Sequence, residues 1–224
     1  MNTTQDLIET LSGRLQPVRP SRPPLSRAAA FVLACLLLVA AAAWLTQAWP
    51  LMLARLTDSR FAVELAATTL TGIAGIAAAF MLAVPDRRRE WAVLPLPFLA
   101  IWLLSSGYGC YRSWLVTGTN GLTLGPSADC FMFIVGFSIP LSAGLWLALK
   151  RSAAWLDPVR TTACAGIGVA ALAAAALQFW HPFDVTVADL AAHAAAVAVV
   201  CTAVIATARR SFPLGHCRAT RPNG

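Results

Sequence analysis

Four residues of this sequence have side chains that suit the binding of a soft metal ion: Cys110, Cys130, His181 and His193. Thiolate and imidazole are the ligands that zinc, cadmium and copper(I) prefer. No close pair of the CxxC kind supports this metal site. A disulfide between Cys110 and Cys130 is a second hypothesis, because one ends an apolar segment and the other begins the next on the same side. On the entropic model, that bond would close a loop of about twenty residues and stabilise the fold by about 3 kcal/mol. We expect no other cofactor.

Asp189 and His193 are four residues apart, which places them on one face of a helix. Both lie in an apolar segment, where an ionisable pair costs several kcal/mol unless it faces the protein interior and is paired. Two interpretations stay open at this point. The pair forms a hydrogen bond between helices, or His193 takes part in the metal site.

The elements that position these residues are long apolar segments. Of the 224 residues, 58% are hydrophobic and 12% are charged, about half of the charged fraction of a soluble domain. Each segment has close to the roughly 20 residues that a helix needs to cross a bilayer, so we predict an all-α polytopic membrane protein. The six predicted spans are Ala28–Trp49, Phe61–Val84, Trp91–Gly109, Cys130–Leu149, Thr161–Trp180 and Val185–Ala208.

Basic residues predict the orientation of these spans. If the N-terminus is cytoplasmic, 14 of the 17 Lys and Arg residues fall on the cytoplasmic side and three on the other. We therefore predict a cytoplasmic tail over residues 1–27, a six-helix membrane domain over 28–208 and a cytoplasmic tail over 209–224. The net charge of +7 then reflects orientation in the lipid bilayer and gives no reason to expect direct binding of nucleic acid.

The N-terminal tail is predicted to carry a short amphipathic helix. Leu7, Ile8, Leu11 and Leu15 follow the spacing of one apolar stripe, and Pro17 ends the helix. A helix of about twelve residues is marginal alone in water, so this stripe must be buried against something. Lipid headgroups and a groove on a cytoplasmic partner are the two alternatives. The acidic polar face and the proline-rich spacer that follows favour the partner.

Several motifs of the chain are shared with a known family. The stretch Asp6–Leu11 reads DLIETL and is followed by Pro17-Val18-Arg19, and Cys110 and Cys130 flank the third connection. In these motifs and in its six spans, the chain resembles the NrsF-like membrane anti-sigma factors of bacteria. The resemblance covers nearly the whole sequence.

The resemblance implies a protein that holds an extracytoplasmic-function sigma factor inactive at the inner membrane and releases it on a periplasmic signal. It also implies which tail residues contact the sigma factor: Asp6, Leu7, Ile8, Leu11, Leu15, Pro17, Val18 and Arg19. The chain departs from the family pattern before the sixth span, where His181 stands at a cysteine position. Imidazole binds metals but forms no disulfide, so this departure favours a response to metal over a response to oxidant.

A small membrane transporter or channel is the competing hypothesis. Gly and Ala in the second and fifth spans permit close helix packing, and Pro95, Pro97 and Pro140 stand where they can break helices as in carriers. Against the transporter hypothesis, the spans hold almost no polar residues that could line a path for a substrate or an ion. We expect no enzyme, because no serine, histidine and carboxylate occur in a recognisable order.

Overall fold

The computed structural model describes residues 4–13, 22–85, 87–117, 124–150, 157–180 and 187–211. Within these ranges the chain is helical, and six helices are long and apolar enough to cross a membrane, as predicted. These six are α2 (Pro24–Leu45), α4 (Ser59–Leu82), α5 (Leu96–Thr117), α6 (Leu124–Lys150), α7 (Pro158–Leu177) and α8 (Val187–Ser211). The shorter elements are α1 (Thr4–Ser12), α3 (Trp49–Arg55) and the 3-10 helix η1 (Arg89–Val93).

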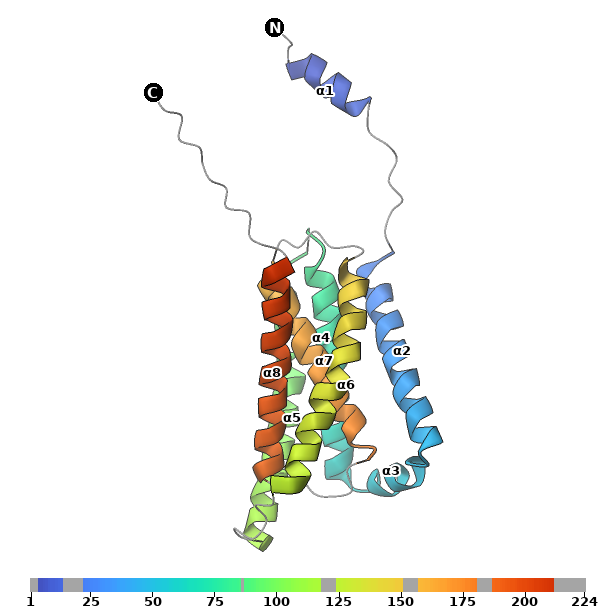
Figure 1. Cartoon of the computed structure of the whole chain (residues 1–224), viewed down its shortest axis with the longest axis vertical. Coiled ribbons are helices and arrows are strands. Elements are labelled where there is room, and N and C mark those ends of the chain that lie inside the picture. Colours follow the sequence, from blue (N-terminus) through green and yellow to red (C-terminus); the bar gives the residue numbers. More distant parts are fainter. Residues whose placement is uncertain are drawn as a thin grey trace, which may run out of the picture.

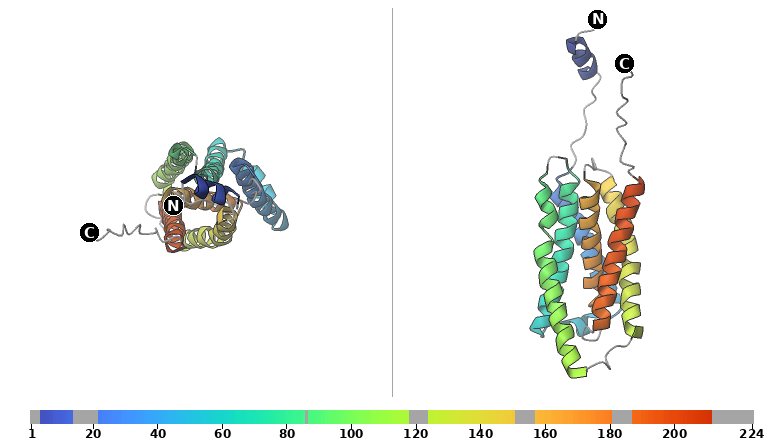
Figure 2. Two further views of the ribbon diagram at one scale, coloured as in Figure 1. Left: turned by 90° about the horizontal axis from the view of Figure 1, so that it is seen from above. Right: turned by 90° about the vertical axis from the view of Figure 1, so that its left-hand side faces the viewer.

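Helices α4 and α7 form the centre of the bundle. In their most apolar windows, 67% of the α4 residues and 78% of the α7 residues are buried, against at most 28% in the other four spans. Figure 2 shows α7 enclosed by α4, α6 and α8, whereas α2 and α5 pack on α4 from outside. The peripheral helices carry exposed leucines such as Leu37 and Leu104, as expected of a surface that contacts lipid.

The α4–α7 contact depends on glycine. A Cβ atom added to Gly75 would lie 2.7 Å from the Cα of Gly168, and one added to Gly168 would lie 2.8 Å from the backbone nitrogen of Ile76. Only residues without a side chain allow two backbones to approach so closely. The close packing predicted for the second and fifth spans is therefore confirmed.

Capping residues decide where these two central helices begin. The carboxylate of Asp58 accepts a hydrogen bond from the backbone nitrogen of Arg60 at 2.9 Å, and that of Asp157 accepts one from Arg160 at 3.2 Å. Pro158 then occupies the first helical position, which needs no amide hydrogen. Each helix begins two to three residues before the apolar segment that predicted it.

The prediction that the first span continues to Trp49 is wrong. Helix α2 ends at Leu45, and the chain reverses through Gln47, which has a φ of 56°. Trp49 instead begins α3, which crosses the end of the bundle opposite to the end where α2 begins and α8 ends (Figure 1). We call the end with α3 the distal end and the other the proximal end.

The connection between the third and fourth spans also differs from the prediction. The third predicted span ends at Gly109 and the fourth begins at Cys130, but α5 continues to Thr117 and α6 already begins at Leu124. Cys110 and Cys130 therefore lie within helices and not at the ends of a loop. The two predicted spans stop near these cysteines because glycine and polar residues lie between them. Both helices nevertheless extend beyond their apolar parts.

Pro140 does not break its span, whereas Pro95 lies at an interruption of the predicted third span. Pro140 lies inside α6, which is continuous from Leu124 to Lys150. Pro95 precedes α5 and Pro97 is its second residue, a position that tolerates proline. The predicted third span, Trp91–Gly109, is therefore divided between η1 and α5 at Pro95, whereas α6 is continuous through Pro140.

An arginine fixes the start of α2 at the proximal end. The Arg27 guanidinium donates a hydrogen bond to the carbonyl of Ala148, near the C-terminus of α6. It also lies 5.1 Å from the ring centroid of Phe80 on α4, within the range of a cation–π interaction. The first turn of α2 is therefore held against two other spans.

Candidate functional site

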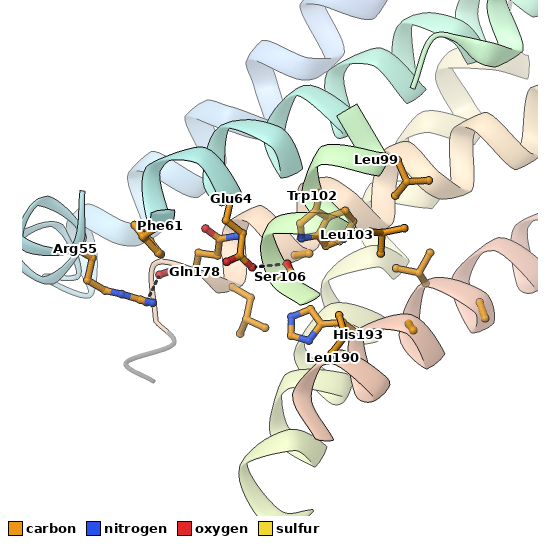
Figure 3. A pocket seen from close by; sticks show the side chains of 15 residues that line it. Arg55, Phe61, Glu64, Leu99, Trp102, Leu103, Ser106, Gln178, Leu190 and His193 are labelled. Atoms are coloured by element: carbon orange, nitrogen blue, oxygen red, sulfur yellow. Dashed lines mark hydrogen bonds between the residues drawn. The ribbon is translucent and has the colours of Figure 1, made fainter. Parts of the chain in front are cut away.

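A cavity of about 310 Å³ lies at the distal end of the bundle, between α4, α5, α7 and α8 (Figure 3). Most of its wall is apolar, with Trp102 of α5 as the largest side chain. Five polar side chains also line it: Arg55, Glu64, Ser106, Gln178 and His193. A largely apolar cavity with a few convergent polar groups is the usual form of a small-molecule site.

Glu64 and Ser106 connect α4 to α5 inside this cavity. The hydroxyl of Ser106 donates a hydrogen bond to Glu64 Oε1 at 2.7 Å, and Ser106 is buried. Because Asp58 fixes the start of α4, Glu64 lies in the second turn of that helix. A carboxylate within a membrane-spanning helix is costly unless it is hydrogen-bonded, so the contact with Ser106 stabilises Glu64 at this depth.

Arg55 lies at the edge of the cavity and joins α3 to the two central helices. Its Nη1 atom donates to the carbonyl oxygen of Gln178, just after the end of α7, at 3.5 Å. Its guanidinium also lies 4.1 Å from the ring centroid of Phe61, close enough for a cation–π interaction. Figure 3 shows Arg55 directed toward Gln178 and not toward His193.

His193 and Asp189 occupy one face of α8, as their spacing predicted. His193 Nδ1 lies 2.7 Å from the backbone carbonyl oxygen of Asp189. Because a carbonyl only accepts, Nδ1 carries the hydrogen, and in the neutral ring Nε2 is the acceptor atom. The interhelical hydrogen bond comes instead from Ser127 of α6, whose hydroxyl donates to Asp189 Oδ1 at 2.7 Å.

The two cysteines predicted to sense metal or oxidant lie in the same distal part of the bundle. Cys110 on α5 and Cys130 on α6 are both buried and both carry thiols. The Asp189 carboxylate is within electrostatic range of both. Among the residues that the structure describes, no three His, Cys, Asp or Glu side chains are placed to hold a metal ion. His181 lies outside the described residues, so the four-residue metal site stays a prediction.

Comparison with protein families identifies the regulatory class of this chain. Residues 11–212 match the family described as NrsF, negative regulator of sigma F. The chain belongs to this family. The description of the NrsF family indicates a regulator of a sigma factor. No curated protein and no solved structure matches the chain.

The NrsF match begins at Leu11, inside α1, so three of the eight predicted partner-binding residues lie before the match and five lie within it. On α1, Asp6 is exposed, and Ile8 and Leu11 are each 56% exposed. Leu7 belongs to α1, but its side chain is outside the described part of the structure. The remaining tail residues lie outside the described ranges: Leu15, Pro17, Val18 and Arg19. Contact between this tail and a partner stays a prediction.

Sequence reasoning missed four polar residues of the cavity: Arg55, Glu64, Ser106 and Gln178. Glu64 stands inside the predicted second span, and a carboxylate in such a segment is itself a signal of a functional position. Arg55 lies between the first and second predicted spans, and the helix that contains it, α3, was not predicted. Ser106 gave no signal, since a single serine in an apolar helix commonly bonds within its own helix.

Proposed function

We propose that the protein is an anti-sigma factor that holds an extracytoplasmic-function sigma factor at the bacterial inner membrane and releases it on a periplasmic signal. The observation that carries this proposal is the match of residues 11–212 to the NrsF family of negative regulators of sigma F. A multi-pass membrane protein inhibits a soluble transcription factor most simply by sequestering it. The sigma factor and the lipid bilayer are then its partners, and it has no direct contact with nucleic acid.

The N-terminal tail is the proposed site of sigma-factor binding. Helix α1 has nine residues, too few for a stable isolated helix in water. Its exposed Ile8 and Leu11 need a partner surface, and the acidic Asp6 and Glu9 on the other face make a headgroup layer a poor one. An amphipathic helix that docks in an apolar groove is a common mode of peptide recognition.

The proposed orientation places the proximal end in the cytoplasm. Basic residues gather at helix ends and connections there, among them Arg27, Lys150 and Arg160, whereas the distal end has Arg55, Arg60 and Arg112. Cytoplasmic loops carry the excess of Lys and Arg in membrane proteins. A periplasm-active reporter fused after residue 210 should therefore be silent, and one inserted at residue 119 should be active.

The proposed signal is a soft metal ion that reaches the distal end from the periplasm. Cys110, Cys130, His181 and His193 would supply thiolate and imidazole ligands for zinc, cadmium or copper(I). The nearby Asp189 carboxylate favours the approach of a cation. Binding that draws α5, α6 and α8 together would change their positions at the proximal end as well, because the helices are continuous. Cys130→Ser should then leave repression intact and blunt induction by cadmium or zinc.

The tail is tested with a matched pair of substitutions in the full-length membrane protein. Leu11→Asp puts a charge in the apolar stripe, whereas Thr10→Asp puts the same charge on the polar face of the same helix. We expect Leu11→Asp to abolish co-purification of the sigma factor and to induce its reporter promoter more than tenfold. Thr10→Asp should retain both binding and repression, with equal protein levels in the membrane.

Two outcomes would contradict the proposed role of the tail. Full repression in Leu11→Asp and in Ile8→Asp/Leu11→Asp would contradict sequestration by the tail. Release by Thr10→Asp as strongly as by Leu11→Asp would mean that any added negative charge disrupts the tail, and the apolar stripe would lose its role.

A further inference from the structure

A groove of about 470 Å³ lies between residues 135–147 of α6 and 199–207 of α8, two helices that pack side by side (Figure 1). We call it the lateral groove, and it shares no lining residue with the distal cavity. We propose that it binds a lipid-soluble quinone, an uncharged flat ring with carbonyl acceptors, to which the Ser138 hydroxyl donates a hydrogen bond. This site goes beyond the control of a sigma factor, and its occupancy is measured without reference to that activity.

The floor of the lateral groove contains a hydroxyl group that needs an acceptor. Ser138 lines the groove and is 2% exposed, and its Oγ atom forms no hydrogen bond within the described part of the chain. A serine in a helix commonly donates to a carbonyl about one turn earlier, as Ser105 does to Trp102. A buried hydroxyl without a partner is costly, so a ligand that accepts its hydrogen bond is favoured.

The depth of Ser138 in the bilayer restricts the source of this acceptor. Ser138 is twelve residues before Lys150, the last residue of α6, which corresponds to about 18 Å along the helix. The hydrocarbon core is about 30 Å thick, so the hydroxyl lies near its middle. The phosphates and ester carbonyls of phospholipids stay at the interface, and acyl chains have no acceptor. A molecule that carries a carbonyl group into the hydrocarbon core is required.

The lining of the lateral groove favours an uncharged ring with an apolar tail. In the described part of the chain, no charged side chain lines it. Trp146 also lines it and offers an indole for contact with a flat ring. Ile139 and Leu147 on its rim are 66% and 59% exposed, so the groove opens toward lipid and a tail can extend into the bilayer. The volume is within the range of small-molecule sites.

Protein occupants fit this groove less well than a quinone. A second copy of the chain would present the same concave surface, so the two rims would meet and the floor would stay empty. A helix of another membrane protein already uses its backbone carbonyls in its own hydrogen bonds. A quinone carbonyl has no such partner and is small enough to reach Ser138.

The test uses the full-length protein in nanodiscs that hold one copy each, with duroquinone and durene as probes. Durene has the same tetramethyl ring but no carbonyl groups. The probe content is measured by extraction and compared with that of empty nanodiscs of the same lipid. We expect the protein-dependent uptake of duroquinone to saturate at one molecule per chain. Its affinity should exceed that of durene by about fivefold or more, as expected of one hydrogen bond.

Two serine substitutions separate the lateral groove from the rest of the bundle. Ser138→Ala removes the donor and keeps an apolar floor, so the affinity for duroquinone should fall to that for durene. The variant should fold as the unmodified protein does, because the hydroxyl has no partner to lose. Ser105→Ala is the matched control on α5, outside the groove, and should retain the preference for duroquinone.

Four outcomes would overturn the proposal. Equal affinity for both probes in the unmodified protein would mean that lipid tails fill the groove without selectivity. An unchanged preference for duroquinone in Ser138→Ala would exclude the proposed hydrogen bond. A loss in Ser105→Ala as large as that in Ser138→Ala would mean that the effect does not come from the groove. No saturable uptake of either probe would leave a helix of a partner protein as the occupant.

Discussion

Helices α4 and α7 take part in two regions of opposite character. In the middle of the bundle they meet at Gly75 and Gly168, with backbones in direct contact. At the distal end, Glu64 of α4 and Leu177 of α7 instead line a cavity. Small residues bring the helices together at one level, and larger or polar residues keep them apart at the other. Close backbone packing and a cavity lined by side chains thus occur in different segments of the same two helices.

The largest expected effect comes from breaking the tight region. Gly75→Ala places a methyl group 2.7 Å from the Gly168 Cα and 2.9 Å from the Cys164 carbonyl oxygen. These are backbone atoms, so the helices must separate, and we expect a loss of about 3 kcal/mol or more in the free energy of unfolding. The measurement is unfolding by SDS in mixed micelles, followed by circular dichroism.

Gly136→Ala on α6 is the matched control for this change. A Cβ atom at residue 136 meets nothing within 4 Å. Alanine is the better helix former, so stability should be unchanged or rise by up to about 1 kcal/mol. Equal losses in the two variants would mean that the crossing at Gly75 is not tightly packed.

The second effect concerns the polar contacts of the distal end. Ser127→Ala removes a donor from the buried Asp189 carboxylate, at a cost of about 2 kcal/mol in the same unfolding measurement. Ser105→Ala is the control, because the Ser105 hydroxyl donates only to the Trp102 carbonyl one turn earlier, at 2.9 Å. If Ser105→Ala lowers the free energy of unfolding as much as Ser127→Ala, the hydrogen bond to Asp189 stabilises the fold no more than a bond within one helix.

A smaller effect is expected where the distal end is closed at its rim. The indole Nε1 of Trp180 donates to the Thr46 hydroxyl at 2.9 Å, joining the end of α7 to the turn after α2. Trp180→Phe keeps the aromatic contact with Phe133 and removes the donor, which should cost about 1 kcal/mol. Trp44→Phe should change nothing, since Trp44 is 70% exposed. A loss in Trp44→Phe as large as that in Trp180→Phe would contradict this assignment.

The smallest effect lies outside both regions. Arg88 and Glu90 form an ion pair of 3.4 Å in the connection before α5, with side chains 83% and 78% exposed. Exposed ion pairs contribute little in water, so Arg88→Gln should cost less than about 0.5 kcal/mol. A loss above 1 kcal/mol would show that this connection is part of the packed structure.

Hydropathy predicted the six spans but not all of their ends. The need for about 20 apolar residues sets the existence of each span, whereas helix ends follow local groups such as Asp58 and Asp157, which stand outside the apolar segments. The turn before α3 was missed because Gln47, not glycine, adopts the positive φ, and the apolar run continues through it.

The candidate site was predictable only where its residues are close in sequence. Spacing placed Asp189 and His193 on one helix face and suggested a bond to another helix. The actual donor to Asp189, Ser127, is 62 residues away, and no local pattern connects the two. Glu64 and Ser106 are 42 residues apart and meet only because α4 and α5 pack together.

The anchoring of α2 by Arg27 has a consequence for any protein that binds α1. Eleven residues join Ser12 to Pro24, a chain that spans at most about 40 Å when fully extended. A protein bound to α1 therefore stays within that radius of a fixed point on the bundle. Confinement to such a volume corresponds to a local concentration in the millimolar range. A second contact between the bound protein and the proximal end of the bundle is then intramolecular in effect, so a modest intrinsic affinity for that end strengthens capture.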